Sequence, residues 1–192
     1  MLSLKHRLGA VHTLAKGGVI AYPTESVFGY GCDPYNEAAV AHLLQIKRRP
    51  VEKGMILVAA NMDQIQPLLA SLPSSQVEQL QATWPGPVTW LIPDLNNIIP
   101  RWIKGRFDSV ALRVSAHPTV QGLCLAWGGP VVSTSANLSG EPPARSEYSL
   151  MRRYHHGHAG SVVDYIVPGQ TQKYNNPTEI RDLKTGRIIR AS

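Results

Sequence analysis

The residues best suited to chemistry are STSAN, at 133–137, where three consecutive hydroxyl side chains precede an alanine and an amide. They follow a short apolar run at residues 130–132. Hydroxyl and amide groups are poor core material because each needs a hydrogen-bonding partner when it is buried. A serine nucleophile would need a GxSxG elbow and a nearby base, and neither accompanies Ser133 or Ser135. We therefore interpret the segment as a polar cradle at a strand end, suited to a nucleotide or a small zwitterion.

A cluster of cations, KRRPVEKG at residues 47–54, follows a predicted helix that is broken at Pro50. Such cations can simply complement the helix dipole and remain solvated. However, a predicted buried strand follows directly, at residues 55–60, so the cations are expected at an edge of the sheet rather than on a free surface. A triphosphate needs several fixed cations of this kind, so a phosphate-binding role is favoured.

A third segment, AYPTESVFGYGCDP at residues 21–34, runs from a predicted strand into a loop with Gly29 and Gly31. The glycine spacing matches neither GxGxxG nor GxxxxGK[ST], which disfavours a Rossmann or P-loop site. The segment is either an ordinary tight turn capped by Thr24 or a ligand-binding loop at the carboxyl end of a strand.

Arg113 lies inside an apolar strand, VALRVS, where an isolated charge would be costly to bury. It needs a carboxylate or a phosphate as partner, and a structural salt bridge is slightly favoured over a ligand. Arg181 has Glu179 and Asp182 as neighbours in the sequence, and we interpret it as structural.

No metal site is predicted. The histidines of RRYHHGH (His155, His156, His158) have no carboxylate or cysteine at ligand spacing, which favours an exposed helix end. The two cysteines, Cys32 and Cys124, are far apart, so neither a disulfide framework nor a zinc site is expected. The tryptophans of WPGPVTW are expected to pack in the core or a loop.

The composition is that of a globular protein with anionic partners. The chain has 192 residues, 43% of them hydrophobic and 17% charged, with a formal net charge of +6. The basic balance favours nucleotides, phosphates or RNA without choosing among them. The sequence contains neither a signal-peptide pattern nor an apolar run long enough to cross a bilayer, so a cytoplasmic location without membrane contact is expected.

The elements that must position these groups form a mixed pattern. Helices are predicted at residues 2–15, 36–49, 61–72 (interrupted), 74–84, 117–127 and 146–156. Strands are predicted at residues 19–23, 55–60, 88–92, 108–115, 130–133, 161–167, 177–182 and 186–191, with a hairpin turn at the Thr-Gly pair near the end. This order predicts one α/β domain over residues 1–192, with a twisted mixed sheet flanked by helices. The weakly patterned segment at residues 93–108 is expected to be a loop, and a mobile flap is one possibility for it.

Six ordered motifs together resemble the threonylcarbamoyl-AMP synthase family, also called the Sua5/YrdC/TsaC family. They are YPTESVFGYGCDP, KRRPVEKG, WPGPVTW, GRFDSVALRVSAHP, VVSTSANLSGEPP and NPTEIRD. The resemblance extends from about residue 18 to residue 190 and is closest to the short, single-domain bacterial form, which implies the YrdC-like fold.

The resemblance implies a nucleotidyltransferase. L-Threonine and bicarbonate (or CO2) would give an N-carboxylated threonine, which attacks the α-phosphate of ATP and releases pyrophosphate. A separate transferase complex would then move the threonylcarbamoyl group to adenosine 37 of tRNAs that read codons beginning with A. Mg²⁺ is expected on the ATP phosphates, with no protein ligands of its own.

The resemblance also implies roles for ten residues of this sequence. Thr24, Arg113, Ser133 and Thr178 would bind threonine; Lys47, Arg49, Lys53, Ser135, Asn137 and Arg190 would bind the nucleotide, with Lys47 and Arg49 catalytic. Thr178 stands where many members have serine, and it keeps the hydroxyl.

Two other functions remain open at this point. The chain could be a binding module whose basic cavity grips double-stranded RNA or tRNA without catalysis, through Arg101, Lys104, Arg106 and the arginines of MRRY. It could also be a paralogue that kept the fold and lost the reaction, although the retained cations and hydroxyls argue against this.

Overall fold

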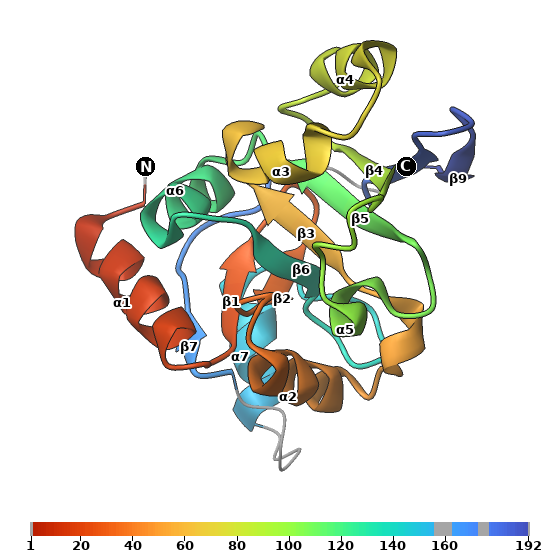
Figure 1. Cartoon of the computed structure of the whole chain (residues 1–192). Coiled ribbons are helices and arrows are strands. Elements are labelled where there is room, and N and C mark those ends of the chain that lie inside the picture. Colours follow the sequence, from red (N-terminus) through yellow and green to blue (C-terminus); the bar gives the residue numbers. More distant parts are fainter. Residues whose placement is uncertain (1, 156–162, 173–176, 192) are drawn as a thin grey trace.

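A mixed β-sheet organises the chain in our computed structural model, which describes residues 2–155, 163–172 and 177–191 (Figure 1). Within these residues the sheet has nine strands in the order β7-β1-β2-β6-β3-β5-β4-β8-β9. The strands are β1 (Ile20–Pro23), β2 (Phe28–Gly31), β3 (Ile56–Ala59), β4 (Val88–Pro93), β5 (Ser109–Val114), β6 (Val131–Ser135), β7 (Tyr165–Ile166), β8 (Glu179–Asp182) and β9 (Ile188–Arg190). The pairs β1–β7, β3–β5 and β4–β8 are parallel and the other pairs are antiparallel. The prediction of a mixed sheet is confirmed.

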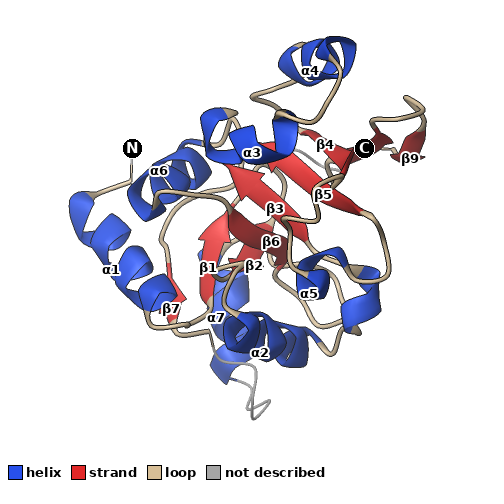
Figure 2. Ribbon diagram, viewed as in Figure 1, coloured by secondary structure: helices blue, strands red, loops and turns tan. Residues whose placement is uncertain are grey.

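Helices surround this sheet, as Figure 2 shows. They are α1 (Leu4–Ala15), α2 (Glu37–Lys47), α3 (Gln66–Leu69), α4 (Ser74–Gln81), α5 (Arg101–Lys104), α6 (Pro118–Trp127) and α7 (Glu147–His155), with two 3₁₀ turns at Val51–Lys53 and Asp63–Ile65. The side chain of Asn36 accepts a hydrogen bond from the backbone N–H of Ala39 and caps α2, as its position in the sequence predicts. Arg48 ends α2 in the left-handed conformation, and Pro50 prevents the helix from continuing.

The two faces of the sheet are covered differently. Successive side chains of a strand point to opposite faces, so Leu57 and Val58 belong to different apolar clusters, as do Val131 and Val132. One cluster continues under α2, α3, α5 and α7, whereas the other lies under α1 and α6, which pack on one another. On that second face the helices cover only part of the strands, and the remainder is available for a site.

The segment after β1 differs from the prediction. The stretch at residues 24–34 is predicted to be a loop, but it contains β2, which pairs with β1 and with β6. The glycines lie in this strand because backbone and side chains of neighbouring strands approach it closely. A Cβ atom on Gly31 would lie 2.4 Å from the carbonyl oxygen of Val132. Here glycine indicates close strand packing rather than a turn.

The segment at residues 93–108 is also more ordered than the predicted weakly patterned loop. It contains α5, and Ile99 and Ile103 are buried in the core. Lys104 Nζ donates to Asp94 Oδ2 at 2.7 Å and to Asn97 Oδ1 at 2.6 Å inside this segment. The segment is therefore an ordered loop with one short helix, and it forms part of a wall of the cavity described below.

The C-terminal part agrees with the prediction where it is described. The Thr-Gly turn at residues 185–186 joins β8 to β9 in an antiparallel hairpin, with Gly186 at φ +70°. The strand predicted at residues 161–167 is shorter, since β7 covers only Tyr165–Ile166, and residues 161 and 162 lie outside the described part. The helix α7 covers most of the predicted helix at 146–156, while His156 and His158 lie outside the described residues. Among the helices that are described, none combines the length and the apolarity needed to traverse a bilayer.

Candidate active site

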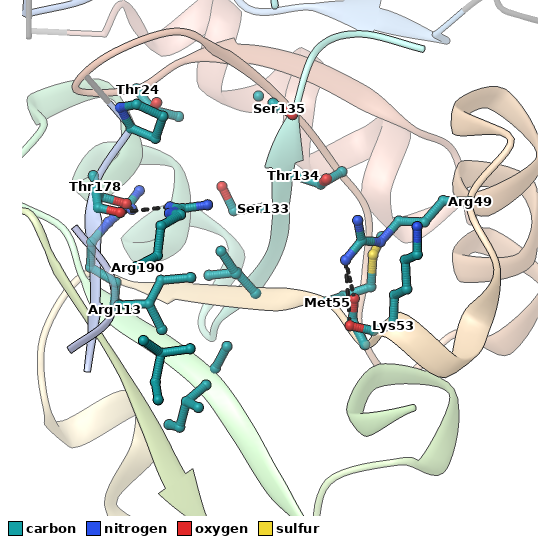
Figure 3. Close-up of a pocket in the computed structure, with 18 of the residues that line it drawn as sticks. Thr24, Arg49, Lys53, Met55, Arg113, Ser133, Thr134, Ser135, Thr178 and Arg190 are labelled. Atoms are coloured by element: carbon teal, nitrogen blue, oxygen red, sulfur yellow. Dashed lines mark hydrogen bonds between the residues drawn. The ribbon is translucent and has the colours of Figure 1, made fainter. Parts of the chain in front are cut away.

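A cavity of about 640 Å³ opens on the part of the sheet that α1 and α6 leave uncovered (Figure 3). Its lining includes side chains at alternate positions of β5 (Ser109, Ala111, Arg113), which therefore point to the same face. Eight of the ten residues that the sequence predicts for the site line this cavity: Thr24, Arg49, Lys53, Arg113, Ser133, Ser135, Thr178 and Arg190. They come from segments between residue 24 and residue 190, and the fold brings them together.

The cavity has two basic ends with hydroxyl groups between them. Figure 3 shows Arg113, Thr178 and Arg190 at one side and Arg49 and Lys53 at the other. The hydroxyls of Ser133, Thr134 and Ser135 lie in the middle of the same view.

The middle group is held by the centre of the sheet. Strand β6 lies between β2 and β3, with Ser133 opposite Ile56 and Ser135 opposite Gly29. The strand is apolar where helices cover it and polar where it borders the cavity. This change in covering explains the abrupt sequence change from valine to serine.

The lining is strongly basic. Six residues with cationic side chains line it: Arg49, Lys53, Lys104, Arg113, Arg145 and Arg190. Two of them, Lys104 and Arg113, are paired with buried carboxylates that do not line the cavity, and among the described lining residues there is neither an aspartate nor a glutamate. A concave surface of one sign with apolar walls raises the local concentration of anions. The cavity is therefore suited to a ligand with several negative charges.

Arg113 combines the two interpretations that the sequence leaves open. It is 4% exposed, and its Nη2 donates to Glu25 Oε2 at 3.0 Å in a buried ion pair. Its Nη1 donates to Thr178 Oγ1 at 2.8 Å, and the residue still lines the cavity. The salt-bridge interpretation is confirmed, and its partner is a carboxylate from the turn between β1 and β2.

Glu25 is a partner of the site that sequence reasoning missed. Its carboxylate also accepts a hydrogen bond from Ser115 Oγ at 2.6 Å. The signal was present, because a buried arginine requires an acidic partner. The sequence did not reveal that the turn after β1 reaches β5.

Two further arginines have their positions fixed by carbonyl groups. Arg190 Nη2 donates to the carbonyl oxygen of Thr178 at 2.6 Å, and burial together with the nearby charge of Arg113 lowers the pKa of Arg190. Arg49 Nη2 donates to the carbonyl oxygen of Gly54 at 2.9 Å, and burial lowers the pKa of Arg49. The buried Nε of Arg49 has no hydrogen-bond partner within the described part of the chain. The Arg49 side chain is partly buried, and both guanidinium groups are fixed cations suited to an anionic ligand.

Lys47 and Asn137 are placed differently from the other predicted residues. Neither lines the cavity, and Lys47 is only 4% exposed. Lys47 Nζ donates to the carbonyl oxygen of Ser135, and at 3.0 Å to both the carbonyl oxygen and Oδ1 of Asn137. Ser135 Oγ donates to Asn137 Oδ1 at 2.6 Å. The pair therefore holds the end of β6 from behind the cavity wall.

The remaining sequence predictions concern residues outside the cavity. No group of three or more histidine, cysteine, aspartate or glutamate side chains is arranged to hold a metal ion among the residues that the structure describes. Cys32 and Cys124 are both free and buried, and burial raises the pKa of Cys124 to about 12. Arg181 pairs with Glu179 and lies over the ring of Trp90, so the structural interpretation of Arg181 is confirmed. Trp84 and Trp90 are core residues, as expected.

Comparisons with known proteins identify the family. The family model described as Sua5_yciO_yrdC, telomere recombination, matches residues 12–192. A threonylcarbamoyl-AMP synthase of Cellvibrio japonicus is 54% identical over 183 residues, which are 95% of this chain and 94% of that protein. A threonylcarbamoyl-AMP synthase of Xanthomonas euvesicatoria pv. vesicatoria is 50% identical over 183 residues, which are 94% of this chain and 95% of that protein.

A solved structure shows the same fold. The crystal structure of P. abyssi Sua5 complexed with L-threonine superposes with a TM-score of 0.83 and 28% sequence identity. The superposition covers 96% of this chain and 52% of that chain, so this chain spans about half the length of the P. abyssi protein.

Proposed function

Because the chain belongs to the Sua5/YciO/YrdC family, we propose that it is a threonylcarbamoyl-AMP synthase, an enzyme of the nucleotidyltransferase type. The observation that carries the proposal is the single cavity in which hydroxyl groups lie between two basic ends. A reaction that joins an amino acid to a nucleotide needs both ligands side by side, and this arrangement offers a place for each.

The proposed reaction consumes L-threonine, bicarbonate (or CO2) and ATP. The amino group of threonine first takes up the carbon as an N-carboxylate, with loss of water when bicarbonate is the donor. An oxygen of that carboxylate then attacks the α-phosphorus of ATP, and the bond to the β-phosphate oxygen breaks. The products are threonylcarbamoyl-adenylate and pyrophosphate.

The amino acid is assigned to the end of the cavity with Arg113 and Thr178. A guanidinium group is the preferred partner of a carboxylate, and Arg113 is already fixed at two of its nitrogens. Thr24 and Ser133 line the cavity near this end and supply hydroxyls for the polar groups of threonine.

The phosphates are assigned to the end with Arg49 and Lys53. Both side chains come from the short connection between α2 and β3, so they are cations on a fixed backbone. We assign Ser135 and Arg190 to the nucleotide as well. Positive groups that are fixed before the reaction stabilise the charge that develops on the leaving pyrophosphate.

Lys47 and Asn137 are assigned a role in the reaction without direct contact to the ligands. Lys47 would have to give up acceptors on Ser135 and Asn137 before it could bind a phosphate. We therefore assign Lys47 and Asn137 to the positioning of Ser135. The catalytic role is assigned to Arg49.

The chemistry makes few demands on the protein beyond charge and position. A carboxylate is already a nucleophile, and pyrophosphate leaves readily once it is neutralised. The described residues offer no set of acidic ligands for a metal, so Mg²⁺ would arrive on the ATP phosphates with water as its other ligands.

The wider role follows the same proposal. The chain would act in the cytoplasm as one YrdC-like domain over residues 1–192, and a separate transferase complex would carry its product to adenosine 37 of tRNA. Basic residues near the cavity, among them Arg101 and Arg106, are candidates for contact with RNA during that transfer.

The test is the release of pyrophosphate by the purified protein. We expect release only when ATP, L-threonine and bicarbonate are all present. The double variant Arg49→Ala/Lys53→Ala should lower the rate at least about 100-fold, because it removes the cations assigned to the leaving group. The double variant Lys5→Ala/Lys16→Ala removes the same charge from the exposed surface of α1 and should retain the rate.

Two results would contradict the proposal. One is pyrophosphate release that does not depend on threonine, and the other is full activity in the Arg49→Ala/Lys53→Ala variant. Absence of any release, together with salt-dependent tRNA binding that is lost when Arg101 and Arg106 are neutralised, would favour the RNA-binding alternative instead. Lys104, which the sequence also suggests for RNA contact, is buried against Asp94 and is not a candidate.

A further inference from the structure

Glu25 lies in the turn between β1 and β2 and does not line the cavity, yet its carboxylate connects to the cavity through Arg113. It is 1% exposed, which is unusual for an acidic residue. Its backbone is fixed independently of the carboxylate, because its carbonyl oxygen accepts from Gln172 N at 3.0 Å. The side chain can therefore be altered without removing this backbone contact.

The carboxylate of Glu25 accepts hydrogen bonds from two side chains. The backbone N–H of His117 donates to Ser115 Oγ at 3.1 Å, and Ser115 Oγ donates in turn to Glu25 Oε1 at 2.6 Å. Arg113 Nη2 donates to Glu25 Oε2 at 3.0 Å. The two oxygens of Glu25 thus serve two different donors, Ser115 and Arg113.

Arg113 forms a second hydrogen bond, to the side chain of Thr178. Its Nη1 donates to Thr178 Oγ1 at 2.8 Å, so the two terminal nitrogens are fixed by two different strands or turns. Two bonds at different nitrogens define the plane of a guanidinium group. The negative charge of Glu25 also offsets the repulsion between Arg113 and the nearby Arg190. Arg113 is thus held in one orientation before any ligand arrives.

We propose that Glu25 is a positioning residue for the amino-acid end of the cavity. By holding Arg113, it fixes the direction in which the guanidinium group meets the carboxylate of L-threonine. A guanidinium group that is oriented in advance does not lose side-chain freedom when the ligand binds, so the affinity for the ligand is higher. The inference rests on the proposed function in one respect, namely that threonine is the ligand at Arg113.

The informative variant is Glu25→Gln, which has nearly the same shape. An amide has one acceptor oxygen and one NH2 donor, so it satisfies either Ser115 or Arg113 and faces the other with a second donor. Because Arg113 loses a charged partner that fixes its orientation, we expect the KM for threonine to rise at least about ten-fold. The KM for ATP should stay within about two-fold, since the phosphate end is unchanged.

A matched control separates positioning from stability. Asp94 forms another buried ion pair, with Lys104 at 2.7 Å, and Asp94 itself does not line the cavity. Asp94→Asn should lower the melting temperature at least as much as Glu25→Gln but leave the KM for threonine unchanged. Equal increases of the threonine KM in both variants would overturn the inference.

A double-mutant cycle tests whether Glu25 acts through Arg113. In an Arg113→Met background, Glu25→Gln should change kcat/KM for threonine by less than about two-fold, because there is no guanidinium left to position. Should Glu25→Gln fail to fold, Ser115→Ala removes one of the two donors to the carboxylate and should raise the threonine KM alone. Additive effects in the cycle, or equal changes in both KM values, would show a structural role only.

The two proposals fail in different ways. If the unaltered protein shows no threonine-dependent pyrophosphate release, the proposed function is wrong and the inference falls with it. If the unaltered protein is active and Glu25→Gln lowers kcat with both KM values unchanged, the function stands and the positioning role is overturned.

Discussion

Fixed guanidinium groups account for most of the cavity's chemistry at the scale of single residues. Arg49, Arg113 and Arg190 each donate to an acceptor of the protein, and each also lines the cavity. Arg113 is buried and Arg49 is partly buried, which weakens their solvation, so an anionic ligand gains more from these two than it would from exposed lysines. The same residues therefore contribute both to the fold and to ligand binding.

His117 provides a pH-dependent test of the region behind Arg113. Its Nδ1 accepts from the backbone N–H of Thr119 and caps α6, while Nε2 lies 3.1 Å from the carbonyl oxygen of Gln170, so the neutral form with hydrogen on Nε2 fits both contacts. Burial lowers the pKa of His117, and the charge of Arg113 lowers it further, against opposing contributions from the Gln170 bond and from Glu25.

The sign of the effect follows from this lowered pKa. Near and below the ordinary histidine pKa of about 6.5, the unfolded chain binds the proton more readily than the folded chain. The stabilising contribution of neutral His117 is therefore present above that pH and is lost as the pH falls through the folded-state pKa. We expect the melting temperature to fall between pH 7.5 and pH 5.5. The variant His117→Asn keeps a cap acceptor without titrating, so its melting temperature should fall less over this interval. An equal fall in both proteins would contradict this account.

At the scale of elements, the close contact of β2 with β6 sets the shape of the cavity floor. Glycine at position 31 permits the carbonyl of Val132 to approach, and Gly29 lies opposite Ser135 on the same pair of strands. A wider separation would move Ser133 and Ser135 relative to Arg113.

The variant Gly31→Ala tests this contact. Its Cβ would meet the backbone oxygen of Val132 at 2.4 Å and Tyr22 at 2.8 Å, so strands must separate. Overpacking of this kind costs about 1–3 kcal/mol, which chemical denaturation would measure as a loss in the free energy of unfolding. Gly129→Ala is the control, because nothing lies within 4 Å of the added Cβ. Equal stability of the two variants would show that β2 and β6 do not need this approach.

The elements also show where sequence reasoning succeeds and fails. The ends of α2 follow from Asn36 and Pro50, because capping and proline act locally. Strand β2 could not be predicted, since the need for glycine comes from β6, which is about one hundred residues away in the chain. The wall at residues 93–108 was missed for a different reason: its order comes partly from the buried ion pair of Lys104 and Asp94, which hydrophobic periodicity does not reveal.

At the scale of the whole molecule, the sheet order produces the site. The β8–β9 hairpin brings Thr178 and Arg190 to Arg113, although β8 follows β5 in sequence by more than sixty residues. Residue types and their place in the sequence indicate six of the eight predicted cavity residues, whereas Thr178 and Arg190 follow only from the resemblance to the family; the sheet makes all eight neighbours. The sequence could not tell that Lys47 would face Ser135 and Asn137 rather than the cavity, because that depends on how α2 meets the end of β6.

The central claim is that one cavity holds the amino acid and the nucleotide together, and a crystal structure with L-threonine and a non-hydrolysable ATP analogue tests it most directly. The account predicts the threonine carboxylate on Arg113 near Thr178, and the triphosphate on Arg49 and Lys53. Binding of either ligand outside this cavity, or threonine located among the cations at Arg49, would contradict it.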